Sequence, residues 1–145
     1  MKLKKIISKL SLEEKVSLLS GFDNWHTPDI KKYGIPKIKM SDGPNGVRGD
    51  SSTPQTSACF PSPILLGATW NEKIIKKIGS ATGEEALYKD VDVLLAPTIN
   101  LHRHPLGGRH FECYSEDPVL TSKIACSYVS GCLLYTSPSP RDLAR

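Results

Sequence analysis

The chain has 145 residues, of which 39% are hydrophobic and 23% are charged. These proportions are close to those of globular proteins and argue against disorder, and no apolar run approaches the roughly 18 residues of a membrane span. The formal net charge of +4 comes mainly from nine lysines against four acidic residues in the first 40 positions. Because these lysines are scattered through amphipathic sequence, they indicate a solvated face, and the sequence predicts neither a nucleic-acid nor a membrane partner.

The first 20 residues carry too many charges for a secretory signal peptide. Lysines precede Ile6 and Ile7, but Lys9, Glu13 and Glu14 interrupt any apolar segment of a leader. We therefore expect the protein to be cytoplasmic.

The cysteines show no pattern typical of a disulfide framework or a metal site. No two of them have a Cys-x-x-Cys spacing, and without an export signal reduced thiols are expected at Cys59, Cys113, Cys126 and Cys132. The run His102-Arg103-His104 is a weak ligand set even beside Cys113, because the arginine would repel a cation. We predict no metal site.

The first expected element is a short helix. Ser11-Leu12-Glu13-Glu14 is a capping-box pattern, in which the serine oxygen and the second glutamate satisfy backbone N–H groups at a helix start. Val16 and Leu19 continue an apolar stripe, and Gly21 is expected to end the helix.

A short strand and a tight loop are expected next. The turn Gly34-Ile35-Pro36 opens an apolar stretch through Met40, which we interpret as a strand whose end carries Asp42. The glycines and the proline of residues 43–49 then require a tight loop. Further on, Asn71 can cap a helix that places Ile74, Ile75 and Ile78 toward a core and three lysines toward solvent.

The second half of the chain repeats the order of strand, polar loop and helix. Residues 91–97 are the best candidate for a parallel strand, because strands covered by helices read as nearly continuous apolar runs. Asp117 and Pro118 are suited to start a closing helix, along which Leu120, Ile124 and Tyr128 recur at helical spacing. The alternation predicts an α/β layer architecture with its loops clustered at one end.

Two polar loops, residues 40–49 and 107–118, follow the two expected strands. They present a carboxylate, Asp42, and a guanidinium, Arg109, at strand ends, where α/β enzymes hold polar substrates. Each residue also has a structural interpretation. Asp42 could cap the turn that follows it, and Arg109 could form a buried ion pair with Glu112 or Glu116.

Several landmarks in order make the chain resemble the N-terminal domain of glycoside hydrolase family 3, which contains many β-glucosidases. The resemblance covers residues 10–131 and rests on Leu12-Glu13-Glu14-Lys15, Leu18-Leu19-Ser20-Gly21, Trp25-His26-Thr27, Gly34-Ile35-Pro36, Ser41-Asp42-Gly43-Pro44, Cys59-Phe60-Pro61, Gly83-Glu84-Glu85, residues 95–100 and residues 109–118. It implies the N-terminal portion of a (β/α)8 TIM-type barrel. The barrel would be incomplete, because a closed one needs roughly 200 residues or more.

The resemblance also implies roles for three residues. Asp42 matches an aspartate that binds the non-reducing sugar, Arg109 matches an arginine that contacts the same sugar, and Arg103 is expected to orient a neighbouring carboxylate. No catalytic residue is expected in this chain, because the family's nucleophilic aspartate, its acid/base glutamate and a sugar-binding Lys-His pair lie further along the sequence. No cofactor is implied.

The last residues differ in character from the rest. We assign residues 1–131 to a partial family 3 domain and residues 132–145 to a tail outside the family, which has neither helical nor strand periodicity. Two interpretations of the tail remain open, a natural flexible terminus or a foreign or mistranslated end on an incomplete gene. In either case we expect it to carry no function.

These observations predict a fragment of a retaining β-glycosidase. The whole enzyme is expected to hydrolyse O-glycosyl bonds from the non-reducing end of β-glucosides or oligosaccharides, and the fragment by itself is expected to be inactive. The alternative is a small carbohydrate-binding module without catalysis, in which Asp42 and Arg109 act together with Trp25 or Trp70 as a stacking platform.

Overall fold

The structure is a computed structural model that describes residues 2–49 and 56–134. In chain order its elements are α1 (Lys2–Lys9), α2 (Leu12–Ser17), the 3-10 turn η1 (Lys31–Tyr33), β1 (Met40–Asp42), α3 (Pro63–Ala68), α4 (Glu72–Tyr88), β2 (Val93–Leu95), the 3-10 turn η2 (His110–Glu112) and α5 (Pro118–Cys132). Residues 135–145 of the predicted tail lie outside the described residues, so its assignment stays a prediction.

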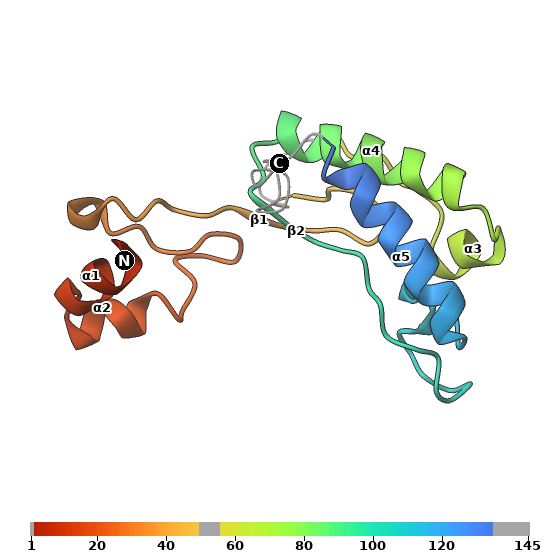
Figure 1. The fold of residues 1–145 in the computed structure, drawn as a ribbon, viewed down its shortest axis with the longest axis horizontal. Helices are drawn as coiled ribbons and strands as arrows, with labels where there is room; N and C mark the ends of the chain where they lie inside the picture. Colours follow the sequence, from red (N-terminus) through yellow and green to blue (C-terminus); the bar gives the residue numbers. More distant parts are fainter. Residues whose placement is uncertain (1, 50–55, 135–145) are drawn as a thin grey trace.

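The N-terminal helices form an arm that stands apart from the rest of the molecule (Figure 1). The predicted capping box is confirmed, since the Ser11 hydroxyl accepts from the Glu14 N–H at 3.1 Å and the Ser11 N–H donates to the Glu14 carboxylate at 2.9 Å. The expected end at Gly21 is wrong. Helix α2 ends at Ser17 with Leu18 as its C-cap, and Leu19 lies outside the helix with 89% of its surface exposed.

Strands β1 and β2 form a parallel pair, as the sequence predicts. Asp42 at the end of β1 is in register with Leu95 at the end of β2, so both polar loops leave the same edge of the sheet. Helices α3 and α4 make the crossover between the strands, which is the connection that a parallel pair requires. Val93 and Leu95 are about half exposed, because the helices of this chain cover only part of the sheet.

Helices α4 and α5 lie side by side and supply much of the buried core (Figure 1). Both predicted N-caps are confirmed: Asn71 accepts hydrogen bonds from the first turn of α4, and Asp117 does so for α5, with Pro118 at the first helical position. A Cβ at Gly79 or Gly131 would collide with backbone of the facing helix. These glycines therefore allow the two helix backbones to touch.

The described residues form two core clusters. The larger one joins α3, α4 and α5 and consists of Leu66, Ile75, Tyr114, Leu120, Ile124 and Tyr128. The predicted stripe of α5 is thus fully buried, whereas in α4 Ile75 is buried, Ile78 is partly buried and Ile74 is 45% exposed. The smaller cluster joins Val47, from the loop that follows Asp42, to Ala86 and Val91.

Within the part of the chain that the structure describes, no helix has both the length and the apolar character needed to cross a lipid bilayer.

Candidate functional site

The two polar loops meet in one cavity of about 240 Å³ at the strand ends. Its walls are Asp42, Pro44, Asn45, Arg48, Arg109, Phe111 and Glu112. The parallel register explains the meeting, since β1 and β2 deliver the segments that follow them to the same edge of the sheet. Asp42 and Arg109, which the sequence predicts as sugar-binding residues, therefore face one space.

The backbone of Asp42 is held by its own loop. Its carbonyl oxygen accepts from the Arg48 N–H at 3.0 Å and from the Ser41 hydroxyl at 3.1 Å, and that hydroxyl accepts in turn from the Gly49 N–H at 2.9 Å. The Asp42 carboxylate makes a different contact, a 3.3 Å ion pair with the guanidinium of Arg48. Among the described residues the carboxylate caps no backbone N–H, so the turn-capping interpretation of Asp42 receives no support.

Close packing explains two glycines of this loop, Gly43 and Gly46. A Cβ at Gly43 would lie 2.6 Å from the Leu94 Cδ1 atom, and one at Gly46 would collide with the Ala58 carbonyl. Gly46 also has a φ of +144°, a conformation that side-chain-bearing residues rarely adopt. The loop thus lies flat on β2 and on the segment that leads to α3.

Arg109 forms a bidentate pair with Glu112. Its Nε–H and one Nη2–H donate to the two carboxylate oxygens at 2.7 and 2.8 Å. The ion pair considered from the sequence is therefore real, but it is not buried, because the arginine side chain is 82% exposed. These hydrogen bonds raise the pKa of Arg109 and lower that of the Glu112 carboxyl, so both groups are ionised at neutral pH.

The pairing leaves donors of Arg109 available to a ligand. A guanidinium has five N–H groups in a fixed fork, and only two of them bond to Glu112. No hydrogen bond from the other N–H groups is found within residues 2–49 and 56–134. The cavity thus combines a half-exposed carboxylate acceptor, Asp42, with an oriented cationic donor, which is the combination that a polyhydroxylated ligand can bind.

Arg103 lies elsewhere. It lines a separate hollow together with His102, His104, Pro105, His110 and Glu116. Glu112, the carboxylate beside Arg109, is oriented by Arg109 itself. The structure therefore does not bring Arg103 to the cavity that holds Asp42, and its predicted role in sugar binding stays a prediction.

The sequence did not identify Arg48, Asn45 and Phe111 as parts of the site. The contact of Arg48 could have been predicted from one pattern. A glycine-rich turn after Asp42 can reverse the chain and bring the arginine back to the carboxylate. Neither Trp25 nor Trp70, the aromatic residues of the alternative carbohydrate-binding module, belongs to the cavity wall.

Groups that could hold a metal are scarce. In the described part of the chain no cluster of histidine, cysteine and acidic residues has the arrangement of a metal site. The four cysteines are free thiols.

Comparison with known proteins identifies the fold and the family. Residues 5–133 match the profile of the glycosyl hydrolase family 3 N-terminal domain. The β-glucosidase 3B of Thermotoga neapolitana in complex with glucose superposes with a TM-score of 0.79 at 39% identity, over 93% of this chain and 22% of that one. The β-glucosidase of Kluyveromyces marxianus in complex with glucose gives a TM-score of 0.82 at 41% identity, over 90% of this chain and 16% of that one.

The fold is thus the opening part of a TIM-type barrel, as the resemblance implies. The chain belongs to glycoside hydrolase family 3, and it matches the N-terminal domain of that family. A β-glucosidase of Rhizobium radiobacter is 55% identical over 128 residues, which are 87% of this chain and 16% of the relative. β-Glucosidase B of Emericella nidulans is 52% identical over 127 residues, 87% of this chain and 15% of the relative. The chain therefore spans about a sixth of the length of these relatives.

Proposed function

We propose that this chain supplies part of the sugar-binding subsite of a retaining β-glucosidase. The substrates would be β-glucosides or oligosaccharides, cleaved from the non-reducing end. The observation that carries the proposal is the meeting of Asp42 and Arg109, from loops far apart in the sequence, in one cavity of about 240 Å³. The names of the relatives support the same substrate class.

The chemistry of the two residues fits vicinal sugar hydroxyls. An ionised aspartate has only acceptor oxygens and can take the protons of two hydroxyls at once, and each charge-assisted hydrogen bond contributes about 1.5–3 kcal/mol. Arg109 can donate to a hydroxyl oxygen while Glu112 holds the guanidinium in place. The sugar would thus be bound from two sides.

The cavity of this chain does not supply a catalytic pair. Retaining hydrolysis needs a nucleophilic carboxylate and a protonated acid about 5–5.5 Å apart. The two carboxylates of the cavity, Asp42 and Glu112, are each paired with an arginine, and Glu116 lines the separate hollow of Arg103. The hydrogen bonds from Arg109 lower the pKa of the Glu112 carboxyl, which makes it a poor proton donor, so we propose that the catalytic pair belongs to other parts of the whole protein.

A chimera tests the proposal. In the β-glucosidase of Rhizobium radiobacter, the segment that aligns with this chain is replaced by residues 5–133 of this chain. Hydrolysis of an aryl β-glucoside by the resulting chimera is then measured. We expect activity, with the β-anomer of glucose as the first product seen by NMR. A folded chimera that hydrolyses no β-glycoside, or that releases the α-anomer first, would overturn the proposal.

The cytoplasmic location and the predicted lack of nucleic-acid and membrane partners stay predictions of the sequence. Cell fractionation with an antibody against this chain would test the first of them.

A further inference from the structure

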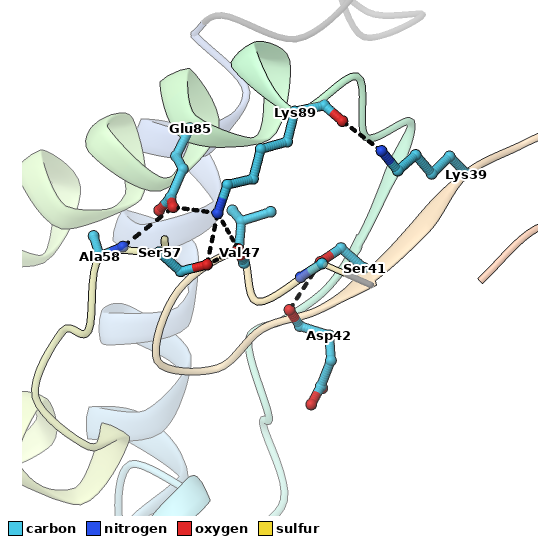
Figure 2. A network of polar contacts seen from close by, with 9 residues as sticks. Lys39, Ser41, Asp42, Val47, Ser57, Ala58, Glu85 and Lys89 are labelled. Carbon is cyan, nitrogen blue, oxygen red and sulfur yellow. Dashed lines mark hydrogen bonds and ion pairs between the residues drawn. The ribbon is translucent and has the colours of Figure 1, made fainter. Parts of the chain in front are cut away.

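A buried lysine lies beneath the loop that follows Asp42. Lys89, the C-cap residue that follows α4, exposes only 5% of its surface. Its ammonium group donates three hydrogen bonds: to the Val47 carbonyl at 2.7 Å, to the Ser57 hydroxyl at 2.6 Å and to the Glu85 carboxylate at 2.7 Å (Figure 2). An ammonium has three protons, so every donor is used.

These bonds tie two segments, one at Val47 and one at Ser57, to Lys89 and Glu85. Val47 lies in the segment that leaves β1, whereas Ser57 lies in the segment that leads toward α3. The Ser57 hydroxyl donates to the Val47 carbonyl at 2.6 Å, and the Ala58 N–H donates to the Glu85 carboxylate at 3.1 Å. Glu85 and Lys89 therefore hold these two segments together.

The segment that contains Val47 leads directly to the candidate site. Val47 is completely buried, and the next residue is Arg48. Arg48 contacts Asp42 twice, through its backbone N–H to the Asp42 carbonyl and through its guanidinium to the carboxylate. A displacement of Val47 would therefore move the arginine that flanks Asp42.

Stability alone is a weak explanation for this arrangement. The cost of removing two charges from water offsets their attraction, and an apolar pair of similar volume often packs as well or better. An apolar pair cannot donate to the Val47 carbonyl, which would then keep only the Ser57 hydroxyl as a donor among these contacts. Figure 2 shows that the Asp42 carboxylate points away from Lys89, so the lysine acts from behind the loop.

We propose that Lys89, held by Glu85, is a positioning residue for the sugar subsite. It fixes the Val47 carbonyl, and through Arg48 it sets the place of the Asp42 carboxylate without touching the sugar. This inference rests on the proposed function, because it assigns a remote determinant to the same subsite.

The test uses the chimera with the double substitution Lys89→Met/Glu85→Gln. Methionine fills a similar volume without a charge, and glutamine still accepts from the Ala58 N–H, so no unpaired buried charge remains. The matched control is Lys77→Met, which removes an exposed lysine of the same helix.

We expect the double variant to lose about 10- to 100-fold in kcat/KM with a raised KM, because misplacement of binding groups by about 1 Å has effects of this size. Lys77→Met should leave both constants unchanged. A purely structural role would reduce the amount of folded enzyme, which lowers the apparent kcat and leaves KM unchanged. That result, or unchanged kinetics, would overturn the inference.

Amide hydrogen exchange gives a second readout that does not need activity. The Arg48 and Gly49 N–H groups bond to the Asp42 carbonyl and the Ser41 hydroxyl, and both should exchange faster in the double variant than in Lys77→Met. Unchanged exchange would overturn the positioning role even if the enzyme were less active. Failure of the unsubstituted chimera to hydrolyse a β-glucoside is a different outcome and counts against the proposed function.

Discussion

The two loops that form the cavity are held in place by different means. The loop of residues 43–49 is fixed from beneath, since Val47 is fully buried and its carbonyl bonds to a lysine at the end of α4. The segment of residues 104–113 is held mostly by hydrogen bonds between residues three positions apart, and Leu106 and Arg109 are largely exposed. The placement of Asp42 therefore depends on the tertiary structure, whereas the placement of Arg109 depends mainly on its own neighbourhood.

The largest effect is expected at Asp42. In the chimera, Asp42→Ala should lower kcat/KM by roughly 10²–10⁴, or about 3–5 kcal/mol, because two charged hydrogen bonds to the sugar are lost. The measurement is steady-state hydrolysis of an aryl β-glucoside together with the affinity for a glucose-like inhibitor, which should weaken by a similar energy.

Addition of azide to the Asp42→Ala chimera separates the anchoring role from a nucleophilic one. A small anion can replace a missing nucleophile but cannot restore a lost sugar anchor. Formation of an α-glycosyl azide from a β-glycoside would make Asp42 the nucleophile and contradict the role assigned to it.

A smaller effect is expected for Arg109→Lys. Lysine keeps the charge but lacks the fork of N–H groups that can bond to Glu112 and to a ligand together, so kcat/KM should fall by roughly 10- to 100-fold. Kinetics of Arg103→Lys provide the comparison. An equal loss there would place Arg103 in the same subsite, and a negligible loss would leave Arg109 as the guanidinium that binds the sugar.

A pair of glycine substitutions compares the two loops directly. Gly46→Ala forces a side chain against the Ala58 carbonyl at a φ of +144°, so we expect a loss of about 1–3 kcal/mol in the free energy of unfolding of the chimera. Gly108→Ala adds a Cβ that meets nothing within 4 Å and should change little. Urea unfolding checks both variants. Equal effects of the two substitutions would show that the loops are equally constrained.

The smallest effect concerns the titration of Glu112. The hydrogen bonds from Arg109 lower the pKa of this carboxyl, so its contribution to the segment's stability is present at neutral pH and is lost as the pH falls through the lowered value. In Arg109→Met the pKa should rise toward the ordinary glutamate value, as measured by carbon-13 NMR of the labelled carboxyl. An unchanged titration would show that Arg109 and Glu112 are not paired in solution.

Much of the secondary structure was predictable because its signals are local. The capping box at Ser11 and the N-caps Asn71 and Asp117 depend on side chains that bond to backbone two or three residues away. The spacing of Leu120, Ile124 and Tyr128 likewise follows from the helical repeat alone. The end of α2 was not predictable in this way, because the helix ends at Ser17, well before the expected stop at Gly21.

The sequence by itself determined the family and predicted Asp42 and Arg109 as sugar-binding residues, because landmark motifs and charged residues at strand ends are visible without coordinates. Only the tertiary structure decided which charges meet. The parallel register brings the loop of Asp42 to that of Arg109, the Arg109 fork selects Glu112 and not Glu116, and Arg103 lines a hollow of its own. The burial of Lys89 beneath Val47 was equally invisible, because a lysine at a helix end normally reaches solvent and only the surrounding packing can keep its ammonium group inside.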